Sequence, residues 1–369
     1  MLNKFAPTAM AIAIACVVAG VALPAAAQSN ITVYGIIDGA VEHYTNATAA
    51  GDSVTRLPSL GGGMFPSRLG FRGAEDLGGG LKAIFALENG FAEDTGALGQ
   101  GNRLFGRQAW VGLAGGWGQV TVGRNYNMMT TSTYDFDLIG PSQYGVGSLD
   151  PFIPNGRSDN SVAYKGTFGG VTAGAHYSLG RDTSSAGGPA GTNCGGESAV
   201  DAHQCREYSA MLRYDTPQWG IVGAYDRLQG GPLASGGLNT SDKTDSRMHG
   251  AVLVKLAAWK VGAGAIIRNN EGNAATPRSN LYYLAAAFKA TPQFTIDGQL
   301  STLDYKDSIN DSKQALVRLL YDFSKRTTVY VAAGRMNNRG TAALTLTAGG
   351  SVGAGLNQTG LITGIKHAF

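Results

Sequence analysis

The sequence predicts an all-β protein, a sixteen-stranded antiparallel barrel that crosses a membrane. Three observations lead to this fold class. Charged residues make up only 15% of the 369-residue chain, yet no long apolar run follows the N-terminal segment. Segments of about ten residues alternate between apolar and polar positions, as the strands of membrane barrels do. The connections between these segments alternate between short turns and long polar loops.

The composition excludes several other classes. Hydrophobic residues account for 43% of the chain and the mean hydropathy is −0.05, which fits neither a bundle of membrane helices nor a highly charged soluble protein. Beyond the N-terminal segment no apolar run approaches the roughly 18 residues that a spanning helix requires. Twelve prolines beside 55 glycines do not fit collagen or proline-rich disorder. A large soluble β protein and an outer-membrane barrel remain.

Residues 1–27 have the three-part pattern of a secretory signal peptide. Lys4 is followed by an apolar run over 9–23 and by the small residues Ala25-Ala26-Ala27. A retained membrane anchor is the alternative, which the small-residue ending disfavours. We therefore expect a cleaved signal peptide at 1–27 and one barrel domain at 28–369. Loss of Lys4 lowers the formal net charge from +3 to +2, too little to indicate a nucleic-acid partner.

Two cysteines remain after the predicted cleavage, Cys194 and Cys205, in a stretch rich in Gly, Ser and Ala. In an exported protein a pair this close indicates a disulfide that closes a loop. Metal binding with His203 is the alternative, but no cluster of the usual ligand spacing completes such a site. We expect the disulfide and no metal centre.

Two segments show the strand alternation most clearly. In 207–215 the even positions are apolar or aromatic and the odd positions are polar, with Met211 as the exception. In 294–301 an apolar face that begins at Phe294 alternates with a polar face. Such a period of two gives a strand one apolar and one polar side.

The connections predict the number of strands. Seven short turns are expected at Leu77–Gly80, Gly115–Gly118, Gly169–Gly170, Pro217–Gly220, Ala258–Trp259, Thr291–Pro292 and Ser324–Lys325. Eight longer polar stretches lie between them, at 45–66, 93–102, 127–158, 181–205, 230–246, 270–280, 306–311 and 338–355. Fifteen connections join sixteen strands. An even strand number with short turns at one end and long loops at the other is the organisation of outer-membrane barrels.

Aromatic residues also fit a membrane barrel. Trp117, Trp219 and Trp259 lie at predicted short turns. Aromatic side chains at one level of a barrel form an interfacial belt, although turns beside apolar strands also attract aromatics. The last residue, Phe369, ends a predicted strand that begins at Leu356, and a soluble sandwich has no reason to end in this way.

Five motifs occur in order along the chain: VYG at 33–35, SRLGFRGAEDLGGGL at 67–81, RQAWVGL at 107–113, VGRNY at 122–126 and GIKHAF at 364–369. Together they resemble the general porins of Gram-negative bacteria, in particular the trimeric sixteen-stranded porins of β-proteobacteria. The resemblance implies a homotrimer in outer-membrane lipid and lipopolysaccharide. It also implies that Phe369 is part of the signal read by the outer-membrane assembly machinery.

The resemblance assigns a role to the longest connection, 127–158. In the family this third loop folds inward and constricts the pore. In this chain it carries Asp135, Asp137 and Asp150 among aromatic residues. An ordinary surface loop is the alternative, which the aromatic and lightly charged composition disfavours.

Facing that loop, the family places arginines on the barrel wall, and Arg68, Arg107 and Arg157 match them. The strand alternation agrees for Arg68 and Arg157, whose neighbours on the opposite face are apolar. It is equivocal for Arg107, because Ala109 and Val111 share its face. The alternative for each is a solvated lumen charge with no special role.

These residues predict a function. A sixteen-stranded barrel is wide enough to hold an aqueous channel. Guanidinium groups stay charged at any working pH, so a cluster of them opposite a few carboxylates attracts small anions. We expect an outer-membrane channel for passive diffusion of small hydrophilic solutes and ions, with a preference for anions. The alternatives are a porin selective for one anionic nutrient and a structural or adhesive barrel with a plugged lumen.

Arg124 shares its predicted face with Val120 and Val122, which points it toward lipid. A charge facing lipid is costly away from the interface. Either Arg124 lies at headgroup level or a neighbouring subunit covers it. Porins of this family latch their second loop onto a neighbour, so Glu93 or Asp94 is the expected partner in trans.

An enzyme is not expected. Residues 349–353 fit G-x-S-x-G, but in a glycine-rich loop without the strand-to-helix elbow that this motif requires. The five histidines, at 43, 176, 203, 249 and 367, are scattered and pair with no evident nucleophile. No cofactor is expected either.

Overall fold

The computed structural model describes residues 30–58, 63–184 and 191–369. The predicted signal peptide at 1–27 lies outside the described residues and stays a prediction. Among the described residues, no helix is long and apolar enough to cross a membrane.

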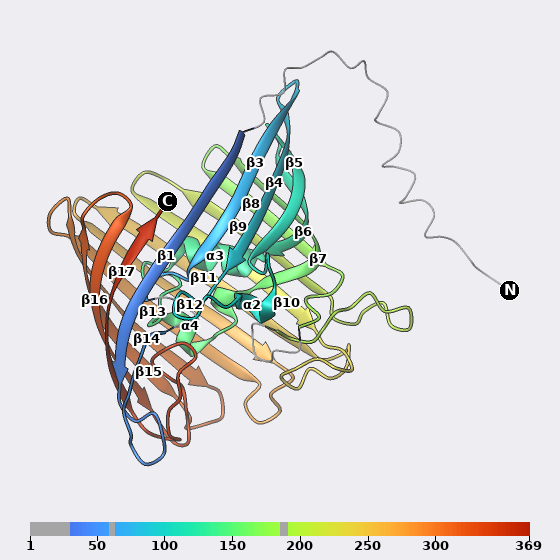
Figure 1. The fold of residues 1–369 in the computed structure, drawn as a ribbon. Coiled ribbons are helices and arrows are strands. Elements are labelled where there is room, and N and C mark those ends of the chain that lie inside the picture. The colour runs from blue at the N-terminus through green and yellow to red at the C-terminus, as the bar shows by residue number, and fades with distance from the viewer. Residues whose placement is uncertain (1–29, 59–62, 185–190) are drawn as a thin grey trace.

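Sixteen long strands form the wall, and a short strand, β2 (Val54–Arg56), lies beside the end of the first. The wall strands are β1 (Asn30–Tyr44), β3 (Arg68–Gly78), β4 (Leu81–Gly90), β5 (Gln108–Gly115), β6 (Gly118–Tyr126), β7 (Arg157–Phe168), β8 (Val171–Ser178), β9 (Glu207–Asp215), β10 (Trp219–Gln229), β11 (Thr244–Leu256), β12 (Trp259–Asn270), β13 (Arg278–Lys289), β14 (Phe294–Tyr305), β15 (Ser312–Asp322), β16 (Thr327–Asn338) and β17 (Gln358–Ala368). Each pairs antiparallel with the next, and β17 pairs with β1, so the sheet is a closed barrel (Figure 1). The predicted strand number and fold class are confirmed.

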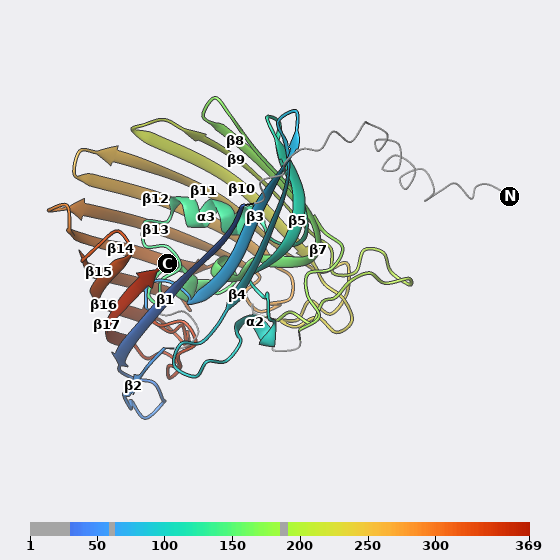
Figure 2. The ribbon, with the colours of Figure 1, turned by 45° about the horizontal axis from the view of Figure 1, so that its top comes forward.

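The two ends of the barrel differ as the sequence predicts. All seven short turns and all eight long loops fall between the expected strands, with boundaries that move by a few residues. Trp117, Trp219 and Trp259 lie at the short-turn end and are each more than 40% exposed. Figure 2 shows the long loops gathered at the opposite end.

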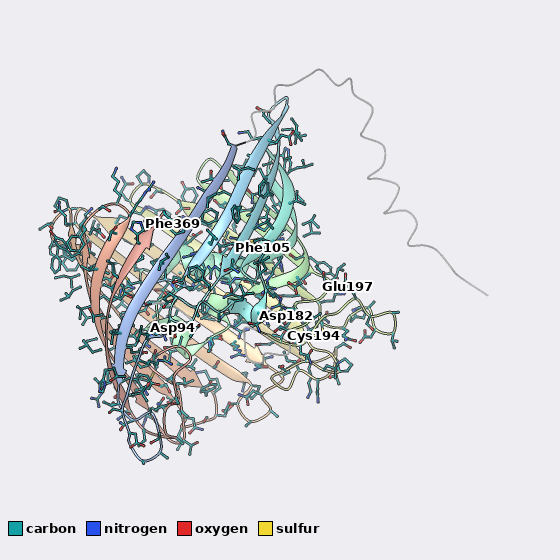
Figure 3. All side chains as sticks on the ribbon, in the orientation of Figure 1. Asp94, Phe105, Asp182, Cys194, Glu197 and Phe369 are labelled. Carbon is teal, nitrogen blue, oxygen red and sulfur yellow. A yellow bond between two sulfur atoms is a disulfide. The ribbon has the colours of Figure 1, made fainter. Side chains whose placement is uncertain are left out.

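The seam between the first and last strands depends on Gly35 and Phe369. The two residues exchange backbone hydrogen bonds of 3.0 and 3.1 Å. A Cβ atom on residue 35 would lie 2.3 Å from the ring of Phe369, so a side chain there displaces the terminal aromatic. Figure 3 shows Phe369 beside β1. The last residue therefore helps to close the barrel.

The wall is amphipathic in the sense opposite to that of a soluble protein. On β15, Val317 and Leu319 are 46% and 43% exposed, whereas Gln314 and Arg318 are each only 3% exposed. Large apolar side chains face outward on nearly every wall strand, while polar and charged side chains face inward. In water such a surface would aggregate, but in lipid it is the favourable arrangement. The barrel is built to be surrounded by hydrocarbon.

We predict that Val317→Arg destabilises the barrel by about 2–4 kcal/mol, because Val317 lies in the middle of β15 on the lipid-facing side. Reversible denaturant unfolding in lipid vesicles measures this change. Lys313→Arg is the control. Residue 313 lies on the same face near the strand end and already carries a cation, so this variant should unfold with the same free energy as the wild type. Equal effects of the two variants would contradict the outward orientation of Val317.

Candidate functional site: the lumen and its arginine cluster

The long connection 127–156 begins at a firmly held residue. Asn127 caps α3 (Met128–Phe136), and its Oδ1 accepts a hydrogen bond from Thr130 N at 2.8 Å. Its Nδ2 donates to the carboxylates of Glu207 and Asp226, at 2.8 and 3.0 Å. These two acids lie on β9 and β10 and are fully buried. The first turn of α3 is therefore attached to the polar face of the wall, and in Figures 1 and 2 the helix lies among the strands.

The rest of this connection is bound to the wall by polar contacts. The guanidinium of Arg247, on β11, donates to both oxygens of Asp150, at 2.7 and 3.2 Å. Arg318, on β15, donates to the carbonyl of Ile139 at 3.0 Å. Gln314, on the same strand, donates to Ser148 in α4 (Val146–Leu149) at 2.7 Å. The connection thus touches inward-facing residues from several strands.

Two of the three predicted arginines meet at one tyrosine. Tyr126 accepts hydrogen bonds at its hydroxyl from Arg107, at 2.8 Å, and from Arg157, at 3.0 Å. The Arg157 guanidinium also lies over the Tyr126 ring, 4.6 Å from its centroid. Tyr134 meets the same ring edge-on at 5.8 Å. Tyr126 therefore fixes the spacing of the two cations.

Arg107 has one carboxylate partner, Glu88, at 2.7 Å. Glu88 also accepts a hydrogen bond from Tyr34 at 2.9 Å. The alternation was equivocal for Arg107 because this residue lies just before β5 begins at Gln108. Outside the strand, a side chain need not follow the alternation of inward and outward faces. The backbone N–H of Arg107 donates to Glu88 O, and the side chain turns to the inward face.

Arg68 begins β3 and lies close enough to Arg107 and Glu88 for their charges to interact. Its guanidinium is 6.0 Å from the Phe65 ring. The cluster, Arg68, Arg107, Arg157 and Glu88, therefore holds three positive charges and one negative charge. The excess is positive.

A cavity of about 770 Å³ adjoins this cluster. Arg107, Arg157 and Asp137 contribute to its lining, together with residues of the loop 339–357 that joins β16 and β17. Asp135, predicted at the same place, does not line it. Asp135 instead pairs with Arg213 on β9. Of the two predicted aspartates, Asp137 alone shares this cavity with the arginines.

Asp137 accepts hydrogen bonds from Gln299 Nε2, at 2.7 Å, and from the Ile139 N–H, at 3.0 Å. Burial nevertheless dominates and raises the pKa of Asp137 to about 6, because it disfavours the charged carboxylate. The carboxyl group is therefore ionised at pH 8 and largely neutral at pH 5.

Arg124 does not have the exposed position that the alternation predicts. The pairing of β6 with β7 shifts register at a bulge in β7, where Asp159 and Asn160 together oppose Arg124 and Asn160 has a φ of 50°. The extra residue belongs to β7, so β6 keeps its own alternation: Val122 pairs with Val111 and Arg124 with Ala109 in one unbroken register with β5. Arg124 is buried and donates to Asp159 at 2.6 Å and to the Gly106 carbonyl at 2.8 Å.

The predicted partner of Arg124 in trans is therefore not needed to neutralise it, since Asp159 belongs to the same chain. Glu93, in the loop 91–107, is partly buried, and burial raises its pKa. Whether Arg124 and Glu93 also contact a neighbouring subunit stays a prediction. Beyond the bulge, Tyr126 at the end of β6 pairs in register with Arg157, and its hydroxyl accepts from both Arg107 and Arg157.

Cys194 and Cys205 form the predicted disulfide, with an S–S distance of 2.05 Å. Both sulfur atoms lie in the loop 179–206, where Figure 3 labels Cys194 near Asp182. The expectation of a loop-closing disulfide is confirmed.

The sequence analysis missed one hydroxyl–imidazole pair. Ser132 Oγ lies 2.9 Å from His249 Nδ1, and His249 Nε2 lies 2.8 Å from the hydroxyl of Tyr283. All three side chains are buried, and Ser132 donates to the carbonyl of Met129. No carboxylate among the described residues bonds to this imidazole. The pair holds α3 against β11 and β13.

Comparison with known proteins agrees with this geometry. The Gram-negative porin family matches residues 11–341. The chain belongs to this family. Outer membrane porin protein 32 of Delftia acidovorans is 30% identical over 361 residues, covering 94% of this chain and 95% of that protein. Major outer membrane protein P.IB of Neisseria meningitidis is 30% identical over 360 residues, covering 94% and 97%.

The solved structure of an anion-selective porin from Comamonas acidovorans matches this porin with a TM-score of 0.73 and 26% identity, covering 93% of this chain and all of that one. The resemblance stated from the motifs is confirmed. The porin is an outer-membrane channel of a Gram-negative bacterium, through which small hydrophilic solutes diffuse passively.

The titration of Asp137 predicts a pH-dependent selectivity. As the pH falls from 8 to 5, the carboxylate near the arginines is neutralised and the ratio of anion to cation permeability should rise. One charge about 10 Å away in water changes each ion's local concentration by roughly twofold in opposite directions, so the ratio should rise roughly fourfold. Reversal potentials under a KCl gradient measure this ratio. Asp137→Asn should show the low-pH ratio at every pH, whereas Asp135→Asn should keep the dependence. A pH dependence that survives Asp137→Asn would rule out this assignment.

Proposed function

We propose that this porin prefers anions and that the cluster of Arg68, Arg107 and Arg157 produces the preference. The observation that supports this most directly is the excess of positive charge beside the cavity, three guanidiniums against Glu88. Arg107 Nη1 and Arg157 Nε are buried and have no hydrogen-bond acceptor among the described residues, so these two cations are not fully paired within that part of the chain. The printed description of the Comamonas relative as anion-selective supports the same reading.

We propose further that the connection 127–156 lies across the lumen and forms the constriction. Its bonds to inward-facing residues of β9, β10, β11 and β15 support this placement. A segment held at so many points narrows the channel without closing it, because the 770 Å³ cavity remains beside it. Anions then pass close to the arginines, where the low dielectric of the wall strengthens their field.

The attraction has to be weak at each point, since a tightly bound ion would stop conduction. Glu88 and Asp137 reduce the field of the cluster. Tyr126 keeps Arg107 and Arg157 together despite their mutual repulsion, so that a small anion meets both. This arrangement suits general anion passage better than one tight nutrient site, and the porin selective for an anionic nutrient remains the second candidate.

Charge-neutralising variants test the proposal. Arg68→Gln, Arg107→Gln and Arg157→Gln should each lower the anion-to-cation permeability ratio by roughly fourfold, since removal of one charge at about 10 Å in water changes anion and cation by about twofold in opposite directions. Glu88→Gln should raise it. The measurement is the reversal potential of the purified porin in a planar bilayer under a KCl gradient.

Arg326→Gln is a matched control, since Arg326 lies in the short turn between β15 and β16 and should leave the ratio unchanged. Conductance with the same selectivity in all four variants would remove the role of the cluster and keep the channel. Absence of conductance in the wild type would instead favour a plugged structural or adhesive barrel. We also propose that no enzymatic activity accompanies the channel, as the family supports.

We propose that the porin is a homotrimer, that lipopolysaccharide and outer-membrane lipid surround it, and that Phe369 is read by the outer-membrane assembly machinery. The family resemblance supports each point. The subunit contact is proposed near Arg124 and Glu93.

The trimer contact predicts that Arg124→Ala and Glu93→Gln lower the heat resistance of the trimer. Samples are incubated at graded temperatures and then run on gels without further heating, and the temperature at which the trimer band disappears is compared. Asp159→Asn separates the two roles of Arg124, because it breaks only the pair within the chain. If Asp159→Asn and Arg124→Ala lower the dissociation temperature equally, Arg124 acts within its own subunit and the contact in trans is abandoned.

A further inference from the structure

A second loop borders the cavity, and the sequence analysis gave it no role. Thr345, Ala348 and Gly349 belong to the loop 339–357 and line the same cavity as Arg107 and Arg157. Within this loop, Leu346 and Thr347 are fully buried. A loop at the mouth of a barrel is ordinarily exposed, so the burial of the segment 345–349 requires an explanation.

Arg56, on the short strand β2, holds this segment from the wall side. Its guanidinium donates to the carbonyl of Gly349 at 2.9 Å, and to Thr347 Oγ1 and the carbonyl of Ala348 at 3.1 Å each. Glu42, opposite Arg56 in the β1–β2 register, is fully buried and accepts the Arg56 Nε–H at 2.9 Å. The Glu42 carboxylate thus orients the Arg56 guanidinium, and both Nη atoms of Arg56 donate to the segment 345–349.

Gln143, in the connection 127–156, holds the segment from the other side. Its Nε2 donates to the same two acceptors, Thr347 Oγ1 at 2.7 Å and the carbonyl of Ala348 at 2.5 Å. The Ala348 N–H donates in return to the Gln143 carbonyl at 3.2 Å. Two donors from different parts of the chain therefore converge on one pair of oxygens.

The wall carries a matching hollow. Gly334 on β16 and Gly360 on β17 are paired in register. A Cβ atom at either position would meet Leu346 and Tyr144, at 2.9 and 3.2 Å from Gly334 and at 3.0 and 2.5 Å from Gly360. The absence of side chains at Gly334 and Gly360 therefore leaves room for Leu346 from the loop 339–357 and for Tyr144 from the connection 127–156.

We propose that the segment 345–349 is a second fixed wall of the channel, and that Arg56 is the positioning residue that holds it there. The connection 127–156 and this segment together set the size limit for solutes, whereas the arginine cluster sets the charge preference. Arg56 adds little to the charge preference, because Glu42 balances its charge.

Arg56→Ala and Gln143→Ala should each raise the single-channel conductance, and the double variant should raise it most, because each donor alone still holds the two shared oxygens. Liposomes containing the double variant should admit larger neutral sugars than wild-type liposomes do. Gln143→Ala carries no charge change, so its reversal potential should equal that of the wild type. Arg335→Ala is the matched control, since Arg335 lies on the exposed face of β16 and bonds only to Asn337 among the described residues.

Gly360→Leu is a second test in case an Arg56 variant fails to fold. It displaces Leu346 and Tyr144 while leaving Arg56 and Gln143 in place, so it should also raise the conductance. An unchanged conductance and an unchanged sugar limit in a folded double variant would overturn the proposal and leave the segment as packing against the wall. A change of reversal potential in Gln143→Ala would also overturn it, since size and charge would then not be separate. Neither outcome bears on the arginine cluster, which the charge variants test independently.

Discussion

A closed ring of backbone hydrogen bonds is the constraint on which the rest of this porin depends. No strand edge is tolerable in hydrocarbon, since each unpaired N–H or C=O group costs several kcal/mol there. The pairing of β17 with β1 meets this constraint, down to the reciprocal bonds of Gly35 and Phe369 at the seam. Closure forces alternate side chains to opposite sides of the wall. The outer side meets lipid, and polar residues are left for the interior.

An interior lined by polar groups is held together differently from a soluble core. Ion pairs such as Arg247–Asp150 and Arg318–Asp297 attach the long connection and the strands to one another. A buried charge without a partner is strongly destabilising, so each of these contacts is specific in direction and in partner. The connections bonded to these wall residues are consequently held in defined positions, which a channel needs if its narrowest part is to keep one shape.

In the proposed function, the arginine cluster and the pair of Arg56 and Gln143 contribute to solute selection in different ways. Tyr126 accepts hydrogen bonds from two guanidiniums and Glu88 compensates one of them; in the proposed function the remaining charge acts on passing ions. Arg56 and Gln143 instead donate hydrogen bonds to the backbone of the loop 339–357, at the carbonyl of Ala348. We propose that the first arrangement distinguishes solutes by charge and the second by size. Both depend on tyrosine, glutamine and glycine residues that carry no charge of their own.

Local pattern determined the strand number, the turns and loops, the signal peptide expectation and the loop-closing disulfide, because each depends on residues close in sequence. Alternation also predicted an inward position for Arg68 and Arg157, and the structure brings Arg157 to Tyr126. Tertiary structure decided the rest. A one-residue bulge in β7 places Asp159 and Asn160 opposite Arg124, whose guanidinium bonds to Asp159, and no period-two pattern records where a bulge falls. Asp135 pairs with Arg213, which is 78 residues away in the sequence. Arg56 bonds to the loop 339–357 at Gly349, which is 293 residues away. Such partners are set by the register and closure of the whole barrel, which no short segment contains.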